Sequence, residues 1–512
     1  MGATHVNSST CTEISPLPSS SQSEFLNLIG GQWRPAASGK TFQSFNPAKP
    51  DEVIGTFPSS AKEDVLAAVE AAKKGFEIWR LTPAPKRGEI LYRAAEILVA
   101  RKEQLAREMT REMGKVLAEA RGDVQEAIDF TYYAAGEGRR LYGQTTPSEL
   151  KNKFAMSVRV PLGVVGLITP WNFPMAIPSW KAMHALICGN ALVIKPATDT
   201  PLLAHRLIEI LAEAGVPDGV INIVHGGGTA VGEPLINHPD VKLISFTGSN
   251  EVGRHVSTLC APTLKHVSLE LGGKNAIIVM EDANLDLAAE GIIWAAFGTS
   301  GQRCTAASRI IVHKDIHAEL RERLVRKINT LKLGFGLEDG VQIGPVVNEA
   351  AMKRILEYVE IGKQDGATLL TGGQRDTAAG PGWFIQPTLF DNVKSGMRIA
   401  QEEIFGPVTA LMPVSSLEEA IQVANGIEFG LSTAIYTRNV NRAFQAMRDL
   451  ESGITYVNAP TIGAEVHLPF GGVKGTGNGH REAGTTGLDI FCEWKTLYVD
   501  HSDQLQRAQI DD

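Results

Sequence analysis

The spacing of hydrophobic positions divides the chain into stretches of different period. Between residues 61 and 138, apolar side chains recur every three or four positions, as in DVLAAVEAAKKGFEIW, and this period predicts amphipathic helices. Between residues 160 and 267, short β-rich runs alternate with helical segments such as PLLAHRLIEILAEAG. The runs are VVGLITP, ALVIKPA, INIVHG, LISFTGS and HVSLELGG. This alternation predicts a parallel sheet with helices on both faces.

A second α/β series follows LELGGKN and continues to about residue 460. The pattern therefore predicts an α/β protein with two α/β domains. Near the end, FCEWKTLYVD alternates apolar and polar residues after a glycine-rich loop. Such a strand needs a partner, in the same chain or in another subunit, and it points to an oligomer.

Composition narrows the class of protein. The 512 residues carry 49 Lys and Arg against 57 Asp and Glu, a formal net charge of −8, with both signs interspersed. With this balance we expect no region of concentrated positive charge that could bind a polyanion, and therefore no nucleic acid partner. No apolar stretch is long enough to cross a bilayer, so we expect no membrane partner either.

The cysteines and the first residues favour the cytoplasm. The five cysteines lie far apart and form no CxxC or Cys/His cluster, which favours a reducing compartment and predicts no metal site. Residues 1–23 are rich in Ser, Thr and Pro but lack a basic start followed by an apolar run, so no secretory signal is expected. We expect this segment to be a flexible tail.

Cys304 is the first candidate for chemistry. It lies in FGTSGQRCTAAS, between a Gly/Ser turn and small residues, where a thiol can be reached by a substrate. The alternative is a buried cysteine that packs as a small hydrophobe. Arg303 is a neighbouring cation that favours a thiolate, unless its side chain is solvated or bridges subunits.

Glu270 and Asn172 suit a cysteine that forms a thioester. Glu270 ends an apolar run in SLELGGKN, and a carboxylate there can activate a hydrolytic water; the alternative is an ion pair with Lys274. Asn172 stands between two prolines in PWNFP. Its amide can stabilise an oxyanion, although asparagine in such a segment is commonly a turn former.

Two segments suit a dinucleotide. FTGSNEVGR places Gly248 and Gly253 at a predicted strand-to-helix junction, where glycines let a pyrophosphate approach the backbone. It matches neither GxGxxG nor the GxxxxGK[ST] loop. Lys195 in ALVIKPATDTP ends a predicted strand and can reach cofactor hydroxyls or phosphate; the alternative is a surface lysine that snorkels.

Seven motifs together resemble the aldehyde dehydrogenase superfamily in order and approximate spacing. They are PWNFP, VIKPATDTP, FTGSNEVGR, LELGGKN, GQRC, EEIFGPV and LPFGGVKGTGNGHRE, and the resemblance covers about residues 25–500. It implies a Rossmann-like nucleotide-binding domain, an α/β catalytic domain, a small β oligomerisation arm, and a homodimer or homotetramer. The implied limits are 24–138 and 161–269 for the nucleotide-binding domain, 270–483 for the catalytic domain, and 139–160 and 484–505 for the arm.

The resemblance also implies roles for single residues. Cys304 attacks the aldehyde, Asn172 and the Cys304 backbone N–H receive the oxyanion, and Glu270 activates water to hydrolyse the thioester. Lys181 and Glu482 match positions that the family links to proton relay. The cofactor, NAD or NADP, is expected to contact Thr169, Trp171, Lys195, Thr198, Gly248, Ser249, Gly253, Glu403 and Phe405.

Thr198 departs from the pattern of many NAD-preferring members, which carry a glutamate three residues after the lysine. A carboxylate there would repel a 2′-phosphate, whereas threonine would not. We therefore expect NADP to be accepted alongside NAD.

Rival activities are separated by the same residues. CoA-acylating relatives typically lack the glutamate base, so Glu270 favours hydrolysis to the free acid. A glyceraldehyde-3-phosphate dehydrogenase of unrelated fold would begin with a dinucleotide fingerprint, which is absent. A non-catalytic protein built on this fold would be free to lose Cys304 or Glu270.

The substrate motifs point in two directions. SGQRCTAASR and AIPSWKAMHAL resemble members that act on semialdehydes of dicarboxylic acids, particularly 2-oxoglutarate semialdehyde, and Arg303 can pair with a distal carboxylate. Trp180 stands where succinate-semialdehyde enzymes often place an arginine. It favours the alternative, a broad-specificity enzyme for aliphatic or aromatic aldehydes. Residues 461–466 are expected to shape the mouth of the cavity.

Overall fold

The computed structural model describes residues 23–510. The first described residue, Ser23, already belongs to strand β1 (Ser23–Glu24), which pairs in parallel with β5 (Lys49–Pro58). Of the predicted tail, Ser23 belongs to this strand, and residues 1–22 lie outside the described residues. Strand β4 (Thr41–Asn46) completes this small sheet.

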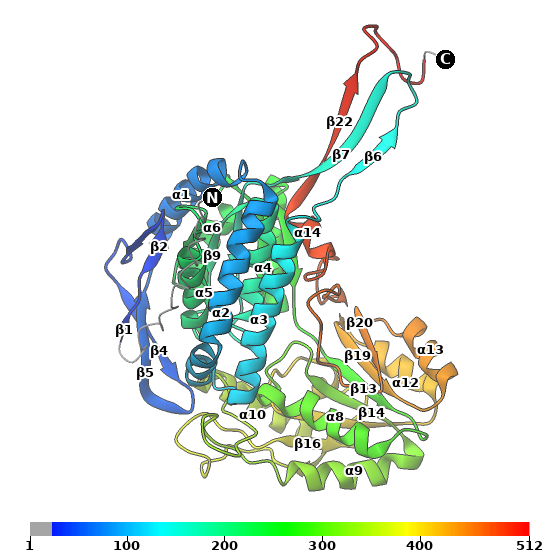
Figure 1. Cartoon of the computed structure of the whole chain (residues 1–512). Helices are drawn as coiled ribbons and strands as arrows, with labels where there is room; N and C mark the ends of the chain where they lie inside the picture. The colour runs from blue at the N-terminus through cyan, green and yellow to red at the C-terminus, as the bar shows by residue number, and fades with distance from the viewer. Residues whose placement is uncertain (1–22, 511–512) are drawn as a thin grey trace, which may run out of the picture.

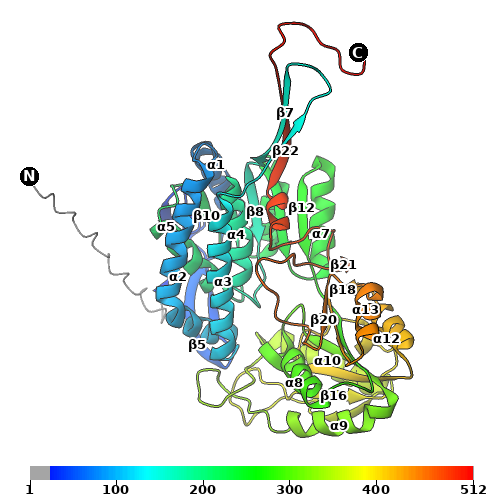
Figure 2. The ribbon, with the colours of Figure 1, turned by 45° about the vertical axis from the view of Figure 1, so that its right-hand side comes forward.

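The predicted amino-terminal helices are confirmed. They are α1 (Lys62–Trp79), α2 (Ala84–Met113) and α3 (Leu117–Glu137). Leu91, Leu98 and Leu105 recur at intervals of seven on α2 and are fully buried, as an amphipathic stripe requires. Figure 2 shows α2 and α3 side by side. No helix within residues 23–510 is long and apolar enough to span a membrane.

The first large sheet contains all five predicted runs as parallel strands. Its order is β12-β11-β8-β9-β10-β2-β3, in which β2 and β3 are antiparallel additions. The bounds are β12 (His266–Glu270), β11 (Val241–Thr247), β8 (Val164–Ile168), β9 (Ala191–Lys195), β10 (Ile221–Ile223), β2 (Asn27–Ile29) and β3 (Gln32–Arg34). Helices α4 (Ala176–Cys188), α5 (Pro201–Glu213), α6 (Glu233–Asn237) and α7 (Asn250–Cys260) connect these strands, with η1 (Gly228–Gly232) and η2 (Ala261–Thr263).

The second large sheet confirms the second α/β series. Its order is β15-β16-β17-β14-β13-β19-β20, parallel except for β15, and it lies below the first sheet in Figure 1. The strands are β15 (Thr368–Thr371), β16 (Thr388–Asp391), β17 (Val408–Val414), β14 (Ala307–His313), β13 (Asn275–Val279), β19 (Ser432–Tyr436) and β20 (Ile454–Val457). The helices are α8 (Leu285–Phe297), η3 (Gly298–Gly301), α9 (Lys314–Ile328), α10 (Glu349–Gln364), α11 (Arg398–Gln401), α12 (Leu417–Asn425) and α13 (Val440–Asp449).

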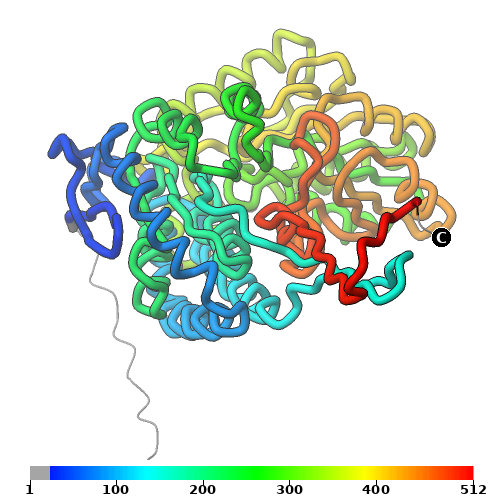
Figure 3. The backbone as a smooth tube through the Cα atoms, turned by 90° about the horizontal axis from the view of Figure 1, so that it is seen from above, coloured from blue at the N-terminus to red at the C-terminus, as the bar shows by residue number. Residues whose placement is uncertain are grey.

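A three-stranded antiparallel arm projects from the part of the molecule that contains the first large sheet, on the side away from the second sheet (Figure 1). It consists of β6 (Gln144–Pro147), β7 (Lys153–Pro161) and β22 (Cys492–Asp500), in the order β22-β7-β6. The predicted carboxyl-terminal strand finds its partner within the chain, because β22 pairs with β7 along its whole length; Figure 3 shows the red segment beside the cyan one. The remaining elements are β18 (Phe429–Gly430), β21 (Val473–Lys474) and α14 (Thr486–Ile490).

Candidate active site

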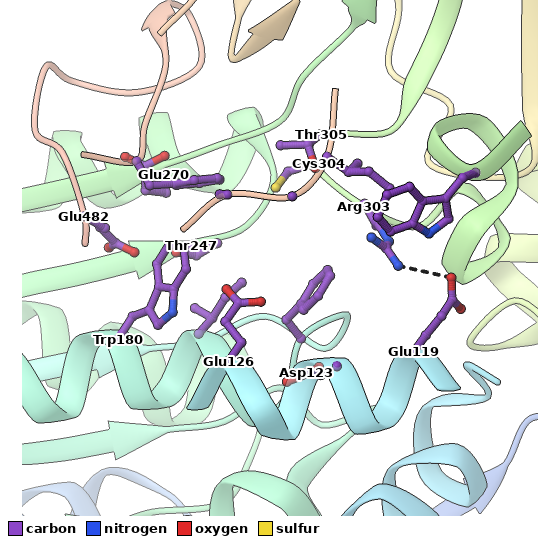
Figure 4. A pocket seen from close by; sticks show the side chains of 18 of the residues that line it. Glu119, Asp123, Glu126, Trp180, Thr247, Glu270, Arg303, Cys304, Thr305 and Glu482 are labelled. Carbon is purple, nitrogen blue, oxygen red and sulfur yellow. Dashed lines mark hydrogen bonds and ion pairs between the residues drawn. The ribbon is translucent and has the colours of Figure 1, made fainter. Parts of the chain in front are cut away.

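A cavity of about 480 Å³ brings together α3, the end of β12, the loop before β14 and residues 462–464. Figure 4 shows Cys304, Glu270 and Glu482 around it. Three of the residues expected at the mouth, Ile462, Gly463 and Ala464, line the cavity. The sequence-predicted nucleophile and base therefore meet in one enclosed space.

The loop before Cys304 has an unusual backbone. Thr299, Ser300 and Gly301 all have positive φ, at 52°, 56° and 70°, and the left-handed region costs a non-glycine residue roughly 1–2 kcal/mol. Glu119 offsets this cost by accepting the Thr299 N–H at 2.8 Å, and the Ser300 hydroxyl donates to a carbonyl at 2.7 Å. The loop holds Cys304 half-buried in the cavity wall, so the interpretation as a core-packing cysteine is wrong.

Two asparagines hold the same loop. The Asn172 amide donates to the Gln302 carbonyl at 3.0 Å, two residues before Cys304. The Asn275 amide donates to the Cys304 carbonyl at 2.7 Å. A Cβ on Gly273 would lie 2.4 Å from that carbonyl oxygen, so only glycine fits beside it. Asn172 thus does more than form a turn, and Asn275 is a supporting residue that the sequence did not reveal.

Arg303 does not act on the thiol as expected. Its guanidinium donates to the Thr299 hydroxyl at 2.9 Å and to Glu119 at 3.1 Å. Burial raises the pKa of Cys304 to about 12, and the nearby carboxylates of Glu270 and Glu403 add to the increase. The prediction that Arg303 favours a thiolate is therefore wrong, because a carboxylate 184 residues away in sequence directs its side chain elsewhere.

Glu270 lies at the carboxyl end of β12, as predicted, and is 4% exposed. Within the described residues, its Oε1 and the ammonium of Lys274 are both buried without a hydrogen-bond partner, so the alternative of an ion pair between them is wrong. Burial raises the pKa of Glu270 well above its ordinary range, and the charge of Glu482 raises it further. A carboxyl group with an unpaired oxygen and a raised pKa is suited to exchange protons.

Lys181, Ser245 and Glu482 form a buried cluster next to Glu270. The ammonium of Lys181 on α4 pairs with Glu482 and donates to the Ser245 hydroxyl at 2.8 Å, and this hydroxyl donates to Glu482 at 3.2 Å. The predicted relay residues are thus brought together. Ser245 was missed, although a serine inside the apolar run LISFT of β11 marks a buried polar position.

Lys195 and Thr198 differ in exposure. Lys195 ends β9 as predicted, is 6% exposed and donates to the Pro196 carbonyl at 2.6 Å, so the alternative of a surface lysine is wrong. Burial lowers its pKa to about 8. Thr198 is exposed, and the buried hydroxyl of Thr169 has no partner. Lys195, Thr198 and Thr169 all lie outside the lining of the Cys304 cavity.

The junction of β11 and α7 is also as predicted. The Ser249 hydroxyl caps α7 by accepting the Val252 N–H at 3.4 Å, and the Gly248 N–H donates to the Glu270 carbonyl at 3.1 Å. A Cβ on Gly253 would lie 2.4 Å from the Leu271 side chain. A larger residue there would have to displace the Leu271 side chain, and the role of Gly253 beside a pyrophosphate stays a prediction.

Glu403 and two aromatic rings complete the expected cofactor residues. Glu403 accepts the Gly273 N–H at 2.9 Å, and burial raises its pKa to about 7. The rings of Trp171 and Phe405 meet edge to face, 5.4 Å apart. Hydroxyl, amine and carboxyl groups, together with the amino end of an 11-residue helix, are the chemistry that a dinucleotide needs. Within residues 23–510, no group of three or more His, Cys, Asp or Glu is arranged to hold a metal ion.

Comparison with known proteins agrees with this chemistry. The model of the aldehyde dehydrogenase family matches residues 33–497. An alpha-ketoglutaric semialdehyde dehydrogenase of Bacillus subtilis (strain 168) is 43% identical over 480 residues, which cover 93% of this chain and 98% of that protein.

Solved structures give the same result. An NAD-dependent aldehyde dehydrogenase from Sinorhizobium meliloti has a TM-score of 0.92 at 38% identity and covers 95% of this chain and 96% of that chain. An NADP-dependent enzyme of E. coli has a TM-score of 0.90 at 37% identity, with 93% and 98% covered. The chain belongs to the aldehyde dehydrogenase family and is an NAD- or NADP-dependent aldehyde dehydrogenase.

Proposed function

We propose that this enzyme oxidises the semialdehyde of a dicarboxylic acid, 2-oxoglutarate semialdehyde in particular, to the free carboxylate. The convergence of Cys304, Glu270 and Arg303 on one cavity carries the proposal. The thiol supplies the nucleophile, the carboxylate supplies the base, and the guanidinium offers a site for the second carboxylate of the substrate.

Cys304 begins the reaction. Its sulfur attacks the aldehyde carbon and gives the anion of a thiohemiacetal, and its high pKa means that the thiol proton must pass to a water molecule as the bond forms. The Asn172 amide, which uses one N–H on the Gln302 carbonyl, has a second N–H for the oxyanion. The backbone N–H of Cys304 is the other donor. Such donors are worth on the order of a hundredfold in rate each.

Bound NAD or NADP supplies the hydride acceptor that turns the thiohemiacetal into a thioester. Lys195 and Glu403 would hold its ribose hydroxyls, and Thr169, Trp171, Gly248, Ser249, Gly253 and Phe405 would line its site. The exposed hydroxyl of Thr198 adds no negative charge, which supports acceptance of the 2′-phosphate of NADP.

Glu270 completes the reaction. Its unpaired Oε1 is free to accept a hydrogen bond from a water molecule, and the carboxylate removes a proton as this water attacks the thioester. The product leaves as the carboxylate, so one proton of the attacking water restores the Cys304 thiol and the other is released. The cluster of Lys181, Ser245 and Glu482 lies next to Glu270 and passes the proton onward.

Arg303 supports a carboxylated substrate. It lines the cavity, and its Nη1 makes no hydrogen bond within the described residues, while Nε and Nη2 are fixed by Thr299 and Glu119. The Bacillus subtilis relative is named for 2-oxoglutarate semialdehyde. The aromatic rings of Trp180 and Phe470 favour the second candidate, a broad-specificity enzyme for aliphatic or aromatic aldehydes.

The remaining expectations are proposals about location and assembly. We propose a cytoplasmic homodimer or homotetramer in which residues 139–160 and 484–505 form the oligomerisation arm. The outer edge of β22 has no partner strand within residues 23–510, and Trp494 and Tyr498 on this strand are 50% and 64% exposed. Residues 24–138 and 161–269 form the nucleotide-binding domain and residues 270–483 the catalytic domain.

A panel of aldehydes tests the substrate. The absorbance of the reduced cofactor gives kcat/KM for glutarate semialdehyde, 2-oxoglutarate semialdehyde, pentanal and benzaldehyde. We expect both carboxylated aldehydes to exceed pentanal by roughly tenfold or more, the value of one charge-assisted contact. If pentanal or benzaldehyde is the better substrate, the broad-specificity alternative is correct.

A further inference from the structure

The wall of the Cys304 cavity contains polar groups that the mechanism does not use. Trp180 is 4% exposed, and its indole N–H is buried without a hydrogen-bond partner in residues 23–510. Glu126 also lines the cavity and forms no hydrogen bond or ion pair within the described residues. A buried donor without a partner costs stability. We therefore expect a ligand in the cavity to form hydrogen bonds with the Trp180 indole N–H and the Glu126 carboxyl group.

The orientation of Trp180 is fixed by neighbouring rings. Phe470 meets the indole edge to face at 5.1 Å, and Phe130 stacks on it at 5.7 Å. The ring cannot turn its N–H toward another partner without breaking these contacts. An indole N–H only donates, so the ligand atom opposite it must be an acceptor.

Glu126 belongs to a stripe of three acids on α3 and has no partner in the part of the chain that the structure describes. Glu119, Asp123 and Glu126 are spaced by four and three residues and share one helix face. Glu119 is bound to Arg303, and Asp123 pairs with Lys115 at 2.8 Å. Figure 4 shows the Glu126 carboxyl group pointing into the cavity beside Trp180. The stripe thus ends in a carboxyl group that has no partner within the described residues and that lines the same cavity as Trp180.

The surroundings of Glu126 keep it protonated at neutral pH. Burial raises its pKa to about 8, and Asp123 adds to the increase, while Lys115 and Arg303 oppose it. The charged groups that face it are Asp123 and Asp129 on its own helix, Lys115 and Arg303 beside it, and Glu270 and Glu482 across the cavity. A protonated carboxyl group is a hydrogen-bond donor.

We propose that Trp180 and Glu126 form the subsite for the 2-keto oxygen of the substrate, each donating one hydrogen bond to it. The inference rests on the proposed function, in which Arg303 takes the adjacent carboxylate. A neutral pair of donors suits a neutral carbonyl, whereas the guanidinium suits the anion. Trp180 therefore acts as a polar specificity residue as well as an aromatic wall.

The variant Trp180→Phe removes the N–H and keeps an aromatic ring. It is compared with the wild type on 2-oxoglutarate semialdehyde and on glutarate semialdehyde, which has the same chain and carboxylate but no keto group. We expect KM for the keto substrate to rise about tenfold, the equivalent of one hydrogen bond. We expect kcat to change less than about twofold, and KM for glutarate semialdehyde likewise.

The variant Glu126→Gln keeps a donor but cannot ionise. For the wild type, KM for the keto substrate is expected to rise above pH 8, where Glu126 loses its proton and repels the substrate oxygens. The Glu126→Gln enzyme should show no such rise. Glu63→Gln, in the exposed first turn of α1 and outside the cavity lining, is the matched control and should keep the wild-type pH profile.

Two results would overturn the subsite. One is an equal rise of KM for both semialdehydes in Trp180→Phe, which would mean that the indole only packs. The other is an unchanged pH rise in Glu126→Gln. The proposed function fails on a different result, which is a wild-type enzyme that prefers pentanal to glutarate semialdehyde. Neither of these substrates has a keto group, so that result does not depend on the keto subsite.

Discussion

The two sides of Cys304 differ in how their polar groups are satisfied. On the cofactor side, Lys195 donates to a carbonyl, Ser249 caps α7 and Glu403 accepts a backbone N–H. On the aldehyde side, Glu126 and Glu270 have carboxyl oxygens without a partner among residues 23–510. The Trp180 N–H and the Thr247 hydroxyl in the same wall also lack partners in this range. Of the expected cofactor residues, Thr169 has a buried hydroxyl without a partner in the described part of the chain.

This difference separates two ways of building a binding site. Internal hydrogen bonds hold the cofactor side in one arrangement, so a ligand finds its partners already positioned. The aldehyde side leaves groups unpaired in a buried space, where each costs roughly 1–3 kcal/mol until a substrate or water pairs with it. Substitutions on the aldehyde side should therefore change chemistry and substrate choice, and those on the cofactor side should change cofactor binding.

The largest expected effect comes from Cys304→Ala, which removes the nucleophile and leaves the cofactor side intact. Turnover should fall by more than about 1,000-fold, measured by reduced-cofactor absorbance, while cofactor affinity from fluorescence titration stays within about twofold. Cys260→Ala, at a buried cysteine on α7 outside the cavity, is the control and should retain activity. Full activity of Cys304→Ala would overturn the assignment of the nucleophile.

Glu270→Gln should divide the reaction into two phases. The nucleophile remains, so one equivalent of reduced cofactor forms rapidly, but the amide cannot take a proton from the water that attacks the thioester. We expect a burst followed by turnover slowed on the order of 100-fold to 1,000-fold, measured by stopped-flow absorbance. A slow reaction without a burst would mean that Glu270 acts before hydride transfer.

Local patterns explain why much of the fold and the site could be predicted. The strands that end at Lys195 and Glu270 are apolar runs bounded by Gly and Pro, so period and punctuation together identify them. Parallel strands then carry these residues to the same edge of the sheet. The motif around Cys304 identified this residue as the candidate nucleophile, but it did not reveal which groups surround the thiol.

Residues set by tertiary packing could not be predicted. Sequence adjacency suggested that Arg303 acts on Cys304, but Glu119 on α3 fixes its direction. The stripe of Glu119, Asp123 and Glu126 was visible as one helix face, yet such a face is usually solvated. Only the packing of α3 against the Cys304 loop encloses it.

Thr198→Glu tests the cofactor side with a smaller expected effect. The added carboxylate should repel a 2′-phosphate, so KM for NADP should rise about tenfold while KM for NAD stays within about twofold. Initial rates with each cofactor at saturating aldehyde measure both values. Thr198→Gln has the same size without the charge and should leave the ratio unchanged. Equal effects on both cofactors would mean that Thr198 lies away from the 2′ position.

Glu482→Gln should give the smallest effect, a shift in the pH profile. Glu270 works as a base only when deprotonated, so kcat rises as pH passes through its pKa. Burial and the charge of Glu482 both raise that pKa. Removing the Glu482 charge therefore lowers the pKa of Glu270. The substitution also leaves the Lys181 ammonium without its ion-pair partner, and this nearby positive charge lowers the pKa of Glu270 further. The rising limb of kcat should therefore move to lower pH.

The maximal kcat, reached on the plateau above the rising limb, distinguishes this charge effect from a loss of structure, because a damaged fold would lower the plateau strongly. The Glu482→Gln substitution keeps the shape of the side chain, so we expect the plateau to fall only a few-fold. Asp489→Asn removes a carboxylate that pairs with Arg159 outside the cavity and should leave the profile unchanged. A limb that stays in place or moves to higher pH would mean that Glu482 does not control Glu270 through its charge. The aldehyde side would then depend on burial alone, since burial is the larger cause of the raised pKa.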